Sequence, residues 1–444
     1  MRWEVAKDEH FRRVVAKGTA QAKPASAHAV HVEVEGLRPG REYYYRFKTG
    51  TEISPAGRMK TAPRPDQDPS RFAFAMASCQ MFEHGYFTPY KHMAQEDLDL
   101  VVHLGDYIYE HAPRVFVGRD GNIRLHQGRE IESLDDYRTR HAQYKTDVDL
   151  QAAHAAFPWV VTFDDHEVDN NWAADIPENT DGPNATREQF LARRAAAFQA
   201  YYEHMPLRRG ARPIGPDMLA YRRLTFGRMA EFSALDTRQY RSDQACGDGT
   251  RIDCAERLDP ERTMTGPEQE QWLLKGLEDS RARWNVIAQQ VFMGQRDFDP
   301  LLPQRFSMDA WDGYKAGRDR LLTHAQSRRV PNPVVLTGDV HQSYVSDLKA
   351  DFDNPNSATI GSEFVCSSIS TTGNGTDDRN ETLLETNPHL KFFEDRRGYM
   401  SCELTAQRWR TDVRVVPSVT TPDSPITTSA SFEVINGAAG AQRV

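Results

Sequence analysis

The sequence contains no apolar run close to the roughly 18 residues that a membrane-spanning helix requires, so no membrane span is predicted. It also has no excess of basic residues, because 55 Lys and Arg are set against 64 Asp and Glu, for a formal net charge of −9. This balance argues against a nucleic-acid complex, since nonspecific nucleic-acid binders are usually basic. Internal repeats and low-complexity tracts are missing too, which excludes a repeat architecture.

Cysteine is scarce, with five in 444 residues. Cys246 and Cys254 lie close together in a Gly- and Asp-rich segment, which predicts a small disulfide loop and therefore an oxidising compartment. Two unpaired loop thiols are the alternative interpretation. Cys366 and Cys402 lie in strand-like runs and are expected to be buried small hydrophobic residues rather than ligands.

Residues 1–62 show the pattern of an all-β module. Short strand-like runs occur at 2–5, 30–34 and 43–48, and the last two are separated by a Pro-Gly turn. A β-sandwich needs about seven strands. Only about four or five fit here, so the front strands are expected to be missing, as if an upstream start had been missed or removed. Three prolines within 61–69 indicate a domain boundary.

After this linker the sequence alternates between apolar β-type runs and helical patterns. The mostly apolar runs are typical of strands that are covered on both faces. Strands are expected at 72–77, 98–104, 160–163, 229–235, 286–288 and 334–337, with a return to strands over 363–435. Helices are expected at 89–96, 135–154, 187–204 and 268–279. The pattern predicts an α/β fold.

Four of these expected strands end in side chains that bind metals. The four strand ends are 78–80, 105–109, 164–167 and 338–341. Open α/β sheets bind ligands at the carboxyl ends of their strands, so these side chains are expected to gather cations at one edge. The chemistry that suits such an edge best is phosphoester hydrolysis by activated water.

The motif Gly105-Asp106-x-x-Tyr109 places a carboxylate where a strand stops. A carboxylate has two oxygens and can bridge two cations, which would give Asp106 a catalytic role. The phenolate of Tyr109 is a hard, anionic ligand for a trivalent ion. The alternative is an Asp that caps a helix and a Tyr that belongs to the core.

The segment 164–171 carries four acids together with His166, Asn170 and Asn171. Buried carboxylates must be paired or bound to cations, and these acids directly follow an apolar run. We therefore favour a functional site that uses Asp164, Asp165 or both over a solvated loop.

Asp339 and His341 are two residues apart, so in an extended segment their side chains face one way. Imidazole is a good ligand for transition metals, although a hydrogen-bonded Asp/His pair is the alternative. Cys79 would be a thiolate beside a cation, or else a buried hydrophobic residue. Thiolate and phenolate together favour iron, and the remaining oxygen ligands suit calcium.

Arg238 directly follows the expected strand that ends at residue 235. Guanidinium matches phosphate in a bidentate way, so Arg238 is a candidate for substrate binding. A surface arginine paired with Asp236 or Asp243 is an equally good interpretation.

With these motifs the chain resembles the PhoD-like alkaline phosphatases, within the calcineurin-like metallophosphoesterase superfamily, over residues 1 to about 435. Purple acid phosphatases share Gly-Asp-x-x-Tyr, but they carry other residues where 78–80 and 164–167 stand here. The resemblance implies an αββα sandwich over 70–435, preceded by a small, incomplete all-β sandwich of fibronectin type III-like character over 1–65.

The resemblance also implies an iron(III) and calcium centre. The implied ligands are Cys79, Asp106, Tyr109, Asp339 and His341, with Asp165 in place of the superfamily's ligating Asn and Asp164 as its rival. Asn171 would be a calcium ligand. Arg238 would bind the substrate phosphate.

The implied reaction is hydrolysis of phosphomonoesters or phosphodiesters by a hydroxide held between the metals. We expect His166 to contact the substrate as proton donor to the leaving group, oriented by Glu167 or Asp169. The alternatives are a phospholipase D-type phosphodiesterase acting on lipid headgroups, and a non-catalytic surface-binding protein. The partner would be a small phosphoester, and the protein a monomer. Similar proteins are exported, which implies an extracytoplasmic location, although residues 1–5 show no signal pattern.

Overall fold

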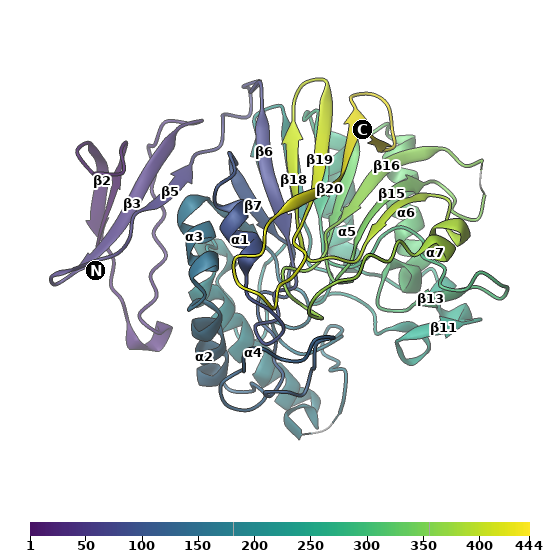
Figure 1. The fold of residues 1–444 in the computed structure, drawn as a ribbon, viewed down its shortest axis with the longest axis horizontal. Helices are drawn as coiled ribbons and strands as arrows, with labels where there is room; N and C mark the ends of the chain where they lie inside the picture. The colour runs from purple at the N-terminus through teal and green to yellow at the C-terminus, as the bar shows by residue number, and fades with distance from the viewer. Residues whose placement is uncertain (181, 355) are drawn as a thin grey trace.

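The computed structural model describes residues 1–180, 182–354 and 356–444, and its body consists of two β-sheets packed face to face (Figure 1). The first sheet has the strand order β21-β20-β19-β18-β6-β7-β8. Its strands are β6 (Phe72–Ala77), β7 (Leu100–His103), β8 (Trp159–Val161), β18 (Gly398–Leu404), β19 (Arg408–Val415), β20 (Thr427–Ile435) and β21 (Gln442–Arg443). β6, β7 and β8 run parallel, so their carboxyl ends meet at one edge.

The second sheet has the order β17-β15-β16-β14-β12-β10-β9. Its strands are β9 (Arg222–Phe226), β10 (Ala230–Ala234), β12 (Trp284–Ala288), β14 (Pro333–Thr337), β15 (Ser343–Lys349), β16 (Thr359–Val365) and β17 (Leu390–Glu394). β10, β12, β14 and β16 are parallel neighbours. This sheet therefore also gathers several carboxyl ends at one edge.

The sequence of β6 explains how the layers pack. Its alternate residues Phe74 and Met76 lie in the core between the two sheets. Ala73, Ala75 and Ala77 face the other way, into the core beneath the helices. Because successive side chains of a strand point to opposite faces, one face is bulky and fills the space between sheets, and the other is small and lets helices approach.

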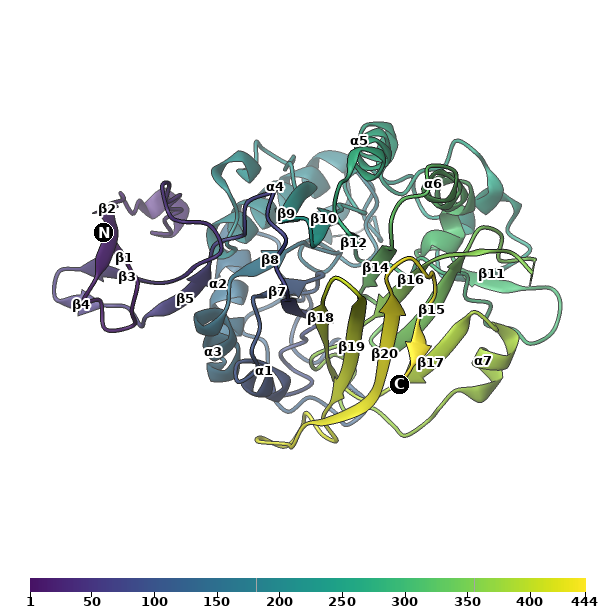
Figure 2. The same cartoon turned by 90° about the horizontal axis from the view of Figure 1, so that it is seen from above.

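Helices cover the outer face of each sheet. The first sheet is covered by α1 (Thr88–Met93), α2 (Leu134–Tyr144), α3 (Val148–Ala156) and α4 (Arg187–His204). α5 (Gly266–Asp279) and α6 (Lys315–Ser327) lie together over the second sheet, as Figure 2 shows, and the short α7 (Glu381–Thr386) lies near β17. The expected αββα sandwich is confirmed. Among the described residues, no helix combines the length and the apolar character needed to cross a bilayer.

The single long helix predicted over 135–154 is wrong, because the chain forms α2 and α3 with a break between them. Asp147 causes the break, since its side chain accepts hydrogen bonds from the backbone N–H groups of Asp149 and Leu150. A side chain that caps a new helix in this way ends the preceding one.

Residues 2–60 form one antiparallel sheet of order β2-β1-β3-β4, with β5 also paired to β3. Its strands are β1 (Arg2–Ala6), β2 (Val14–Thr19), β3 (Glu42–Thr49), β4 (Glu52–Ile53) and β5 (Gly57–Lys60). The Tyr43 hydroxyl accepts a hydrogen bond from the Arg38 N–H at 3.0 Å, which ties β3 to the turn before it. Within the described residues this sheet is not paired with a second sheet.

The strand predicted at 30–34 is wrong, because this segment pairs with no strand in the described part of the chain. It lies instead along a cavity of about 910 Å³ between the N-terminal sheet and the body. Glu33 accepts a hydrogen bond from the Arg209 N–H at 3.1 Å, and His31 contacts the Leu207 carbonyl. The apolar alternation of 30–34 therefore reflects the cavity wall rather than a sheet.

Candidate metal centre

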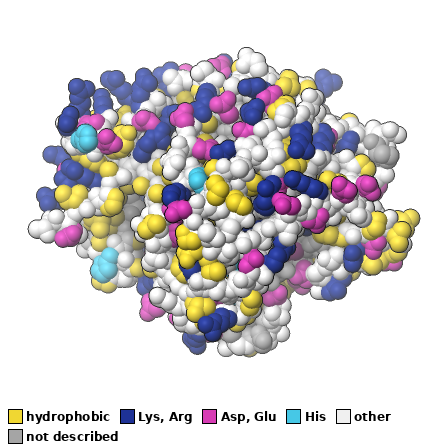
Figure 3. Space-filling model, viewed as in Figure 1, with side chains coloured by type: hydrophobic (Ala, Val, Ile, Leu, Met, Phe, Trp, Pro, Cys, Tyr) yellow, Lys and Arg dark blue, Asp and Glu magenta, His cyan; other side chains and the backbone are white. Residues whose placement is uncertain are grey.

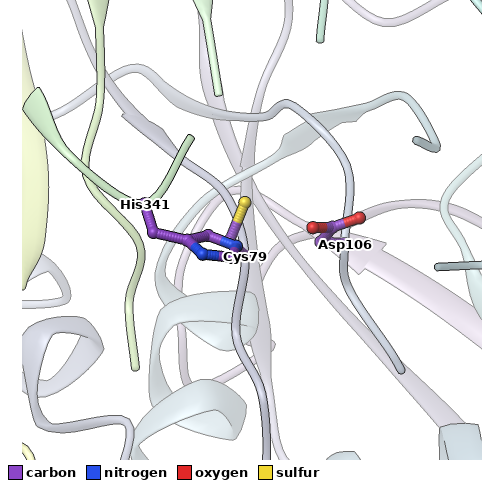
Figure 4. A group of neighbouring side chains, drawn as sticks. All are labelled: Cys79, Asp106 and His341. Carbon is purple, nitrogen blue, oxygen red and sulfur yellow. The ribbon is translucent and has the colours of Figure 1, made fainter. Parts of the chain in front are cut away.

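Cys79, Asp106 and His341 converge at the carboxyl edge of the two sheets (Figure 4). Cys79 follows β6 and Asp106 follows β7, while His341 lies in the turn after β14 of the opposite sheet. Their candidate ligand atoms lie within 4.8 Å of one another. Three segments that are distant in sequence thus supply a sulfur, a carboxylate and an imidazole to one point.

Tyr109 belongs to the same group. Its hydroxyl donates to Asp106 Oδ2 at 2.9 Å and lies 3.4 Å from His341 Nε2. Thr371 links it to Cys79, because the Thr371 hydroxyl lies 2.9 Å from the phenol oxygen and donates to the Cys79 carbonyl at 2.7 Å. The structure therefore brings together four of the residues predicted to bind the metals: Cys79, Asp106, Tyr109 and His341.

A second group of acids lies beside the first. Candidate ligand oxygens of Asp164, Asp165 and Asp339 lie within 4.8 Å of one another, and those of Asp106 and Asp165 are grouped in the same way with His166. Asp106 is thus common to the thiolate group and to an acidic group. This is the arrangement that a carboxylate bridging two cations requires.

Buried oxygen atoms without partners show that these side chains fit a metal centre. Asp106 Oδ1, Asp164 Oδ2 and Asp165 Oδ1 are fully buried and accept no hydrogen bond from the described residues. Buried carboxylates are normally paired or bound to cations. Asp164 and Asp165 each keep one oxygen without a hydrogen bond, so either residue can offer an atom to a cation.

The pKa values of these side chains also indicate that the cluster is stabilised by bound cations. Burial, with the charge of Asp309 as the second cause, raises the pKa of Asp339 to about 7. Burial raises the pKa of the Cys79 thiol well above its ordinary value, with the charge of Asp106 as the second cause. Anionic forms are disfavoured where like charges crowd in a low dielectric, and bound cations reverse this effect.

The backbone at the strand ends is strained. Cys79, Asp106, Asp339 and His341 have φ values of 58°, 58°, 64° and 58°, and Asn171 has 48°. Non-glycine residues adopt this left-handed region at a cost of order 1–3 kcal/mol each, and such residues cluster at functional sites. At Cys79, Asp106, Asp339 and His341 the chain therefore leaves the extended conformation of the preceding strand.

Glycine precedes two of these residues for steric reasons. A Cβ on Gly105, whose φ is +108°, would lie 2.5 Å from the Asp164 Cβ. A Cβ on Gly338 would lie 2.7 Å from the Ser78 side chain. The neighbouring strand ends can therefore approach one another only because both positions lack a side chain.

Glu167 holds the first strand ends in place. Its carboxylate accepts hydrogen bonds from the backbone N–H groups of Asp106, Tyr107 and Asp164, at 3.1, 2.7 and 2.8 Å. The side chain is 1% exposed, so these bonds are shielded from water. Glu167 is thus a buried clamp on the turns that carry Asp106 and Asp164.

His166 is oriented by Glu110, and not by Glu167 or Asp169 as the sequence predicted. Its Nδ1 lies 2.7 Å from Glu110 Oε2, and its ring centroid lies 4.1 Å from that of Tyr109, with the two rings tilted by 33°. Asp169 is committed elsewhere, to Arg193 at 3.1 Å. Burial lowers the pKa of His166, but the charges of Glu110, Asp165 and Asp106 outweigh it and raise the pKa.

Arg238 is fully buried among acids. Its Nε donates to Asp164 Oδ1 at 2.6 Å, and its two terminal nitrogens donate to the two Asp309 oxygens at 2.8 and 3.1 Å. The surface pairing with Asp236 or Asp243 is wrong, since the guanidinium pairs with neither among the described residues. Whether Arg238 contacts substrate stays a prediction.

Asn171 lies at the margin of the acidic group. Its backbone N–H donates to Asp165 Oδ2 at 2.8 Å, and its side-chain amide donates to Asp248 Oδ2 at 2.7 Å. Asp248 belongs to the loop closed by the Cys246–Cys254 disulfide, which the structure forms as predicted. Sequence reasoning missed Glu110, Asp248 and Asp309, although Glu110 directly follows the Gly-Asp-x-x-Tyr motif.

Comparisons with known proteins agree over the whole chain. Residues 74–413 match the family model described as "PhoD-like phosphatase", and residues 1–63 match "PhoD-like phosphatase, N-terminal domain". The chain is 54% identical to alkaline phosphatase D of Bacillus subtilis (strain 168), across 100% of this chain and 76% of that protein. A solved structure described as "Structure of PhoD" superposes with a TM-score of 0.97 at 53% identity, covering 100% of this chain and 84% of that one.

Proposed function

Because the chain belongs to the PhoD-like phosphatase family, we propose that it is a metal-dependent hydrolase of phosphomonoesters and phosphodiesters that uses iron(III) and calcium. Metal-dependent phosphoester hydrolysis follows from the family, and the identity of the two metals is our proposal. The matches do not favour the phospholipase D-type or surface-binding alternatives. The observation that carries the proposal is the buried, unpartnered oxygen of Asp106 between two groups of ligand atoms.

The donor atoms divide by chemical type. Cys79, Tyr109 and His341 offer sulfur, phenol oxygen and nitrogen, which suit iron(III). The carboxylates and the Asn171 amide offer oxygen, which suits calcium. Asp106 is proposed to touch both ions. When bound, the cations lower the pKa of water and neutralise charge on the phosphoryl oxygens, which is the chemistry that hydrolysis requires.

The protein's own residues are proposed to handle charge and the proton. Glu110 fixes the His166 ring through Nδ1, which leaves Nε2 free to give a proton to the leaving oxygen. Arg238 is proposed to help neutralise the substrate phosphate. Its support is a guanidinium nitrogen 3.9 Å from Asp339 at the edge of the acidic group.

Replacing His166 with Asn is expected to slow the hydrolysis of an alkyl phosphate by about 10²- to 10⁴-fold, because an alkoxide leaves poorly without a proton. An aryl phosphate with an acidic phenol should lose much less, since its leaving group needs no proton. The measurement is kcat for both substrates with metal content determined in parallel. Glu110→Gln should shift the same ratio in the same direction. Equal losses for both substrates with full metal content would rule out proton donation by His166.

The purified protein is expected to be coloured, because a thiolate and a phenolate on iron(III) absorb visible light. Elemental analysis should find iron and calcium together. Tyr109→Phe and Cys79→Ser should each change the visible band, whereas the exposed Tyr240→Phe should leave it unchanged. A colourless protein that contains only calcium and still hydrolyses phosphoesters would overturn the roles of Cys79 and Tyr109.

The remaining assignments are proposals of the same kind. We propose a β-module over 1–65, a catalytic domain over 70–435, a monomeric state and an extracytoplasmic location. The disulfide between Cys246 and Cys254 supports an oxidising compartment. Acidic and basic side chains are interspersed over the face drawn in Figure 3, which favours a small phosphoester over a nucleic acid as partner.

A further inference from the structure

The disulfide between Cys246 and Cys254 closes a short loop at the margin of the metal centre. Their Cα atoms are 6.2 Å apart, Cys254 is buried and Cys246 is exposed. The loop is tied to the body by β11 (Thr250–Ile252), which pairs with β13 (Arg305–Ser307). A hydrogen bond of 2.9 Å from the Met308 N–H to the Gly249 carbonyl adds to this pairing. The loop is therefore a fixed part of the structure.

This loop contacts Asn171 through the Asp248 side chain, and Gln244, which lies just before the loop, adds a second contact. Asp248 Oδ2 lies 2.7 Å from Asn171 Nδ2, and Gln244 Nε2 donates to the Asn171 carbonyl at 2.6 Å. A carboxylate only accepts hydrogen bonds, so the amide nitrogen of Asn171 must be the atom that faces Asp248. The amide oxygen of Asn171 is then directed away from Asp248.

Asp165 bonds to Asn171 as well. Its Oδ2 accepts the Asn171 backbone N–H at 2.8 Å, while its buried Oδ1 accepts no hydrogen bond from the described residues and lies 3.6 Å from an Arg238 nitrogen. Asn171 is thus bonded through its backbone to a candidate metal ligand and through its side chain to the disulfide loop. Partners that orient a ligand from behind in this way set both its geometry and the affinity for the metal.

Asp248 holds its position at a conformational cost. Its φ of 62° and ψ of −174° lie in a region that essentially only glycine adopts, at a cost of order 1–3 kcal/mol. Asp248 nevertheless stands between Gly247 and Gly249, where a third glycine would relieve the strain. The presence of an acid in such a strained conformation indicates that its side chain has a functional role.

Resting on the calcium role proposed above for Asn171, we infer that Asp248 is a positioning residue that aims the Asn171 amide oxygen at calcium. The Cys246–Cys254 disulfide keeps Asp248 in place. The affinity of the enzyme for calcium thereby depends on this disulfide, a bond that is typical of oxidising compartments.

The test is calcium titration by calorimetry into protein that retains iron but has been depleted of calcium. Asp248→Ala is expected to weaken calcium binding about tenfold or more, the usual effect of removing a partner that orients a ligand. The visible iron band should not change. Asp248→Asn should keep affinity close to wild type, because an amide oxygen accepts the same hydrogen bond.

Asp253→Ala is the matched control. Asp253 lies in the same loop, is exposed, has a φ of 53° and has no side-chain hydrogen bond within the described chain. It should bind calcium as the wild type does. Wild-type affinity in Asp248→Ala would overturn the inference. Equal weakening by Asp248→Asn and Asp248→Ala would also overturn it, since it would make Asp248 a direct ligand.

Two further variants separate this inference from the proposal beneath it. Asn171→Ala with unchanged calcium affinity would remove the ligand role of Asn171 itself. Weak binding in Asn171→Ala together with normal binding in Asp248→Ala would overturn the positioning role alone. The double variant Cys246→Ser/Cys254→Ser should lose calcium affinity in the same direction as Asp248→Ala, and wild-type affinity there would overturn the role of the disulfide.

Discussion

Replacing Asp106 with Asn is expected to lower kcat/KM by at least about a hundredfold, the loss typical when one charge-stabilising group leaves an active site. The larger part should come from lost metal. Asp106 is the one acid shared by the group that contains Cys79 and His341 and the group that contains Asp165. An amide keeps the size of the side chain but offers a single neutral oxygen, so it cannot bridge two cations.

The measurement combines steady-state kinetics with elemental analysis of the same preparation. Iron and calcium should both fall relative to wild type. Asp135→Asn provides a control. Asp135 is an exposed acid at the start of α2, and in sequence it lies outside the segments that carry the candidate ligands. Turnover near wild type in Asp106→Asn with both metals retained would contradict the bridging role.

Glu167→Ala is expected to reduce the free energy of unfolding by about 3 kcal/mol or more. The substitution leaves three buried backbone N–H groups without an acceptor, and each such group costs about 1–3 kcal/mol. Activity should fall with stability, since the turns that carry Asp106 and Asp164 lose their common clamp.

Urea unfolding of the metal-free protein gives the relevant comparison, because any contribution of bound cations is then removed. Glu188→Ala in the exposed first turn of α4 should stay within about 0.5 kcal/mol of wild type. A loss below about 1 kcal/mol in Glu167→Ala would mean that the three N–H groups find other partners, and the clamp would be rejected.

The positions of the candidate ligands could be predicted from the sequence because one simple rule governs them. An apolar run followed by Gly-Asp or Ser-Cys marks the carboxyl end of a buried strand, and parallel strands bring such ends to one edge. Asp106 and Asp339 each follow a glycine in this way. Their convergence with Cys79 and His341 needed no knowledge of the strand order.

The partners behind the ligands could not be predicted, because hydrogen bonds between distant segments leave no periodic pattern in a sequence. Glu110 lies 56 positions from His166, and Asp309 lies 71 from Arg238. The sequence suggested Glu167 or Asp169 for His166, since both lie within three positions of it. The structure shows that Glu167 faces the backbone instead.

Two errors in the fold have different origins. The break between α2 and α3 could have been predicted from the sequence, since Asp147 is a good capping residue and a helix start signal. The false strand at 30–34 was not readable, because its alternation of apolar and polar residues is what a strand shows. Only the absence of a pairing neighbour in the described chain, which is a tertiary property, excludes it.

The joining of two sheets at one edge has a consequence for biosynthesis. Tyr109 and His341 are 232 positions apart, and Cys79 and Thr371 are 292 apart. A nascent chain still on the ribosome therefore lacks two of the candidate ligand residues, Asp339 and His341, until the segment after β14 has been made. Contacts of such long range form late in folding. A chain cut short before residue 341 would therefore lack the imidazole of the candidate centre.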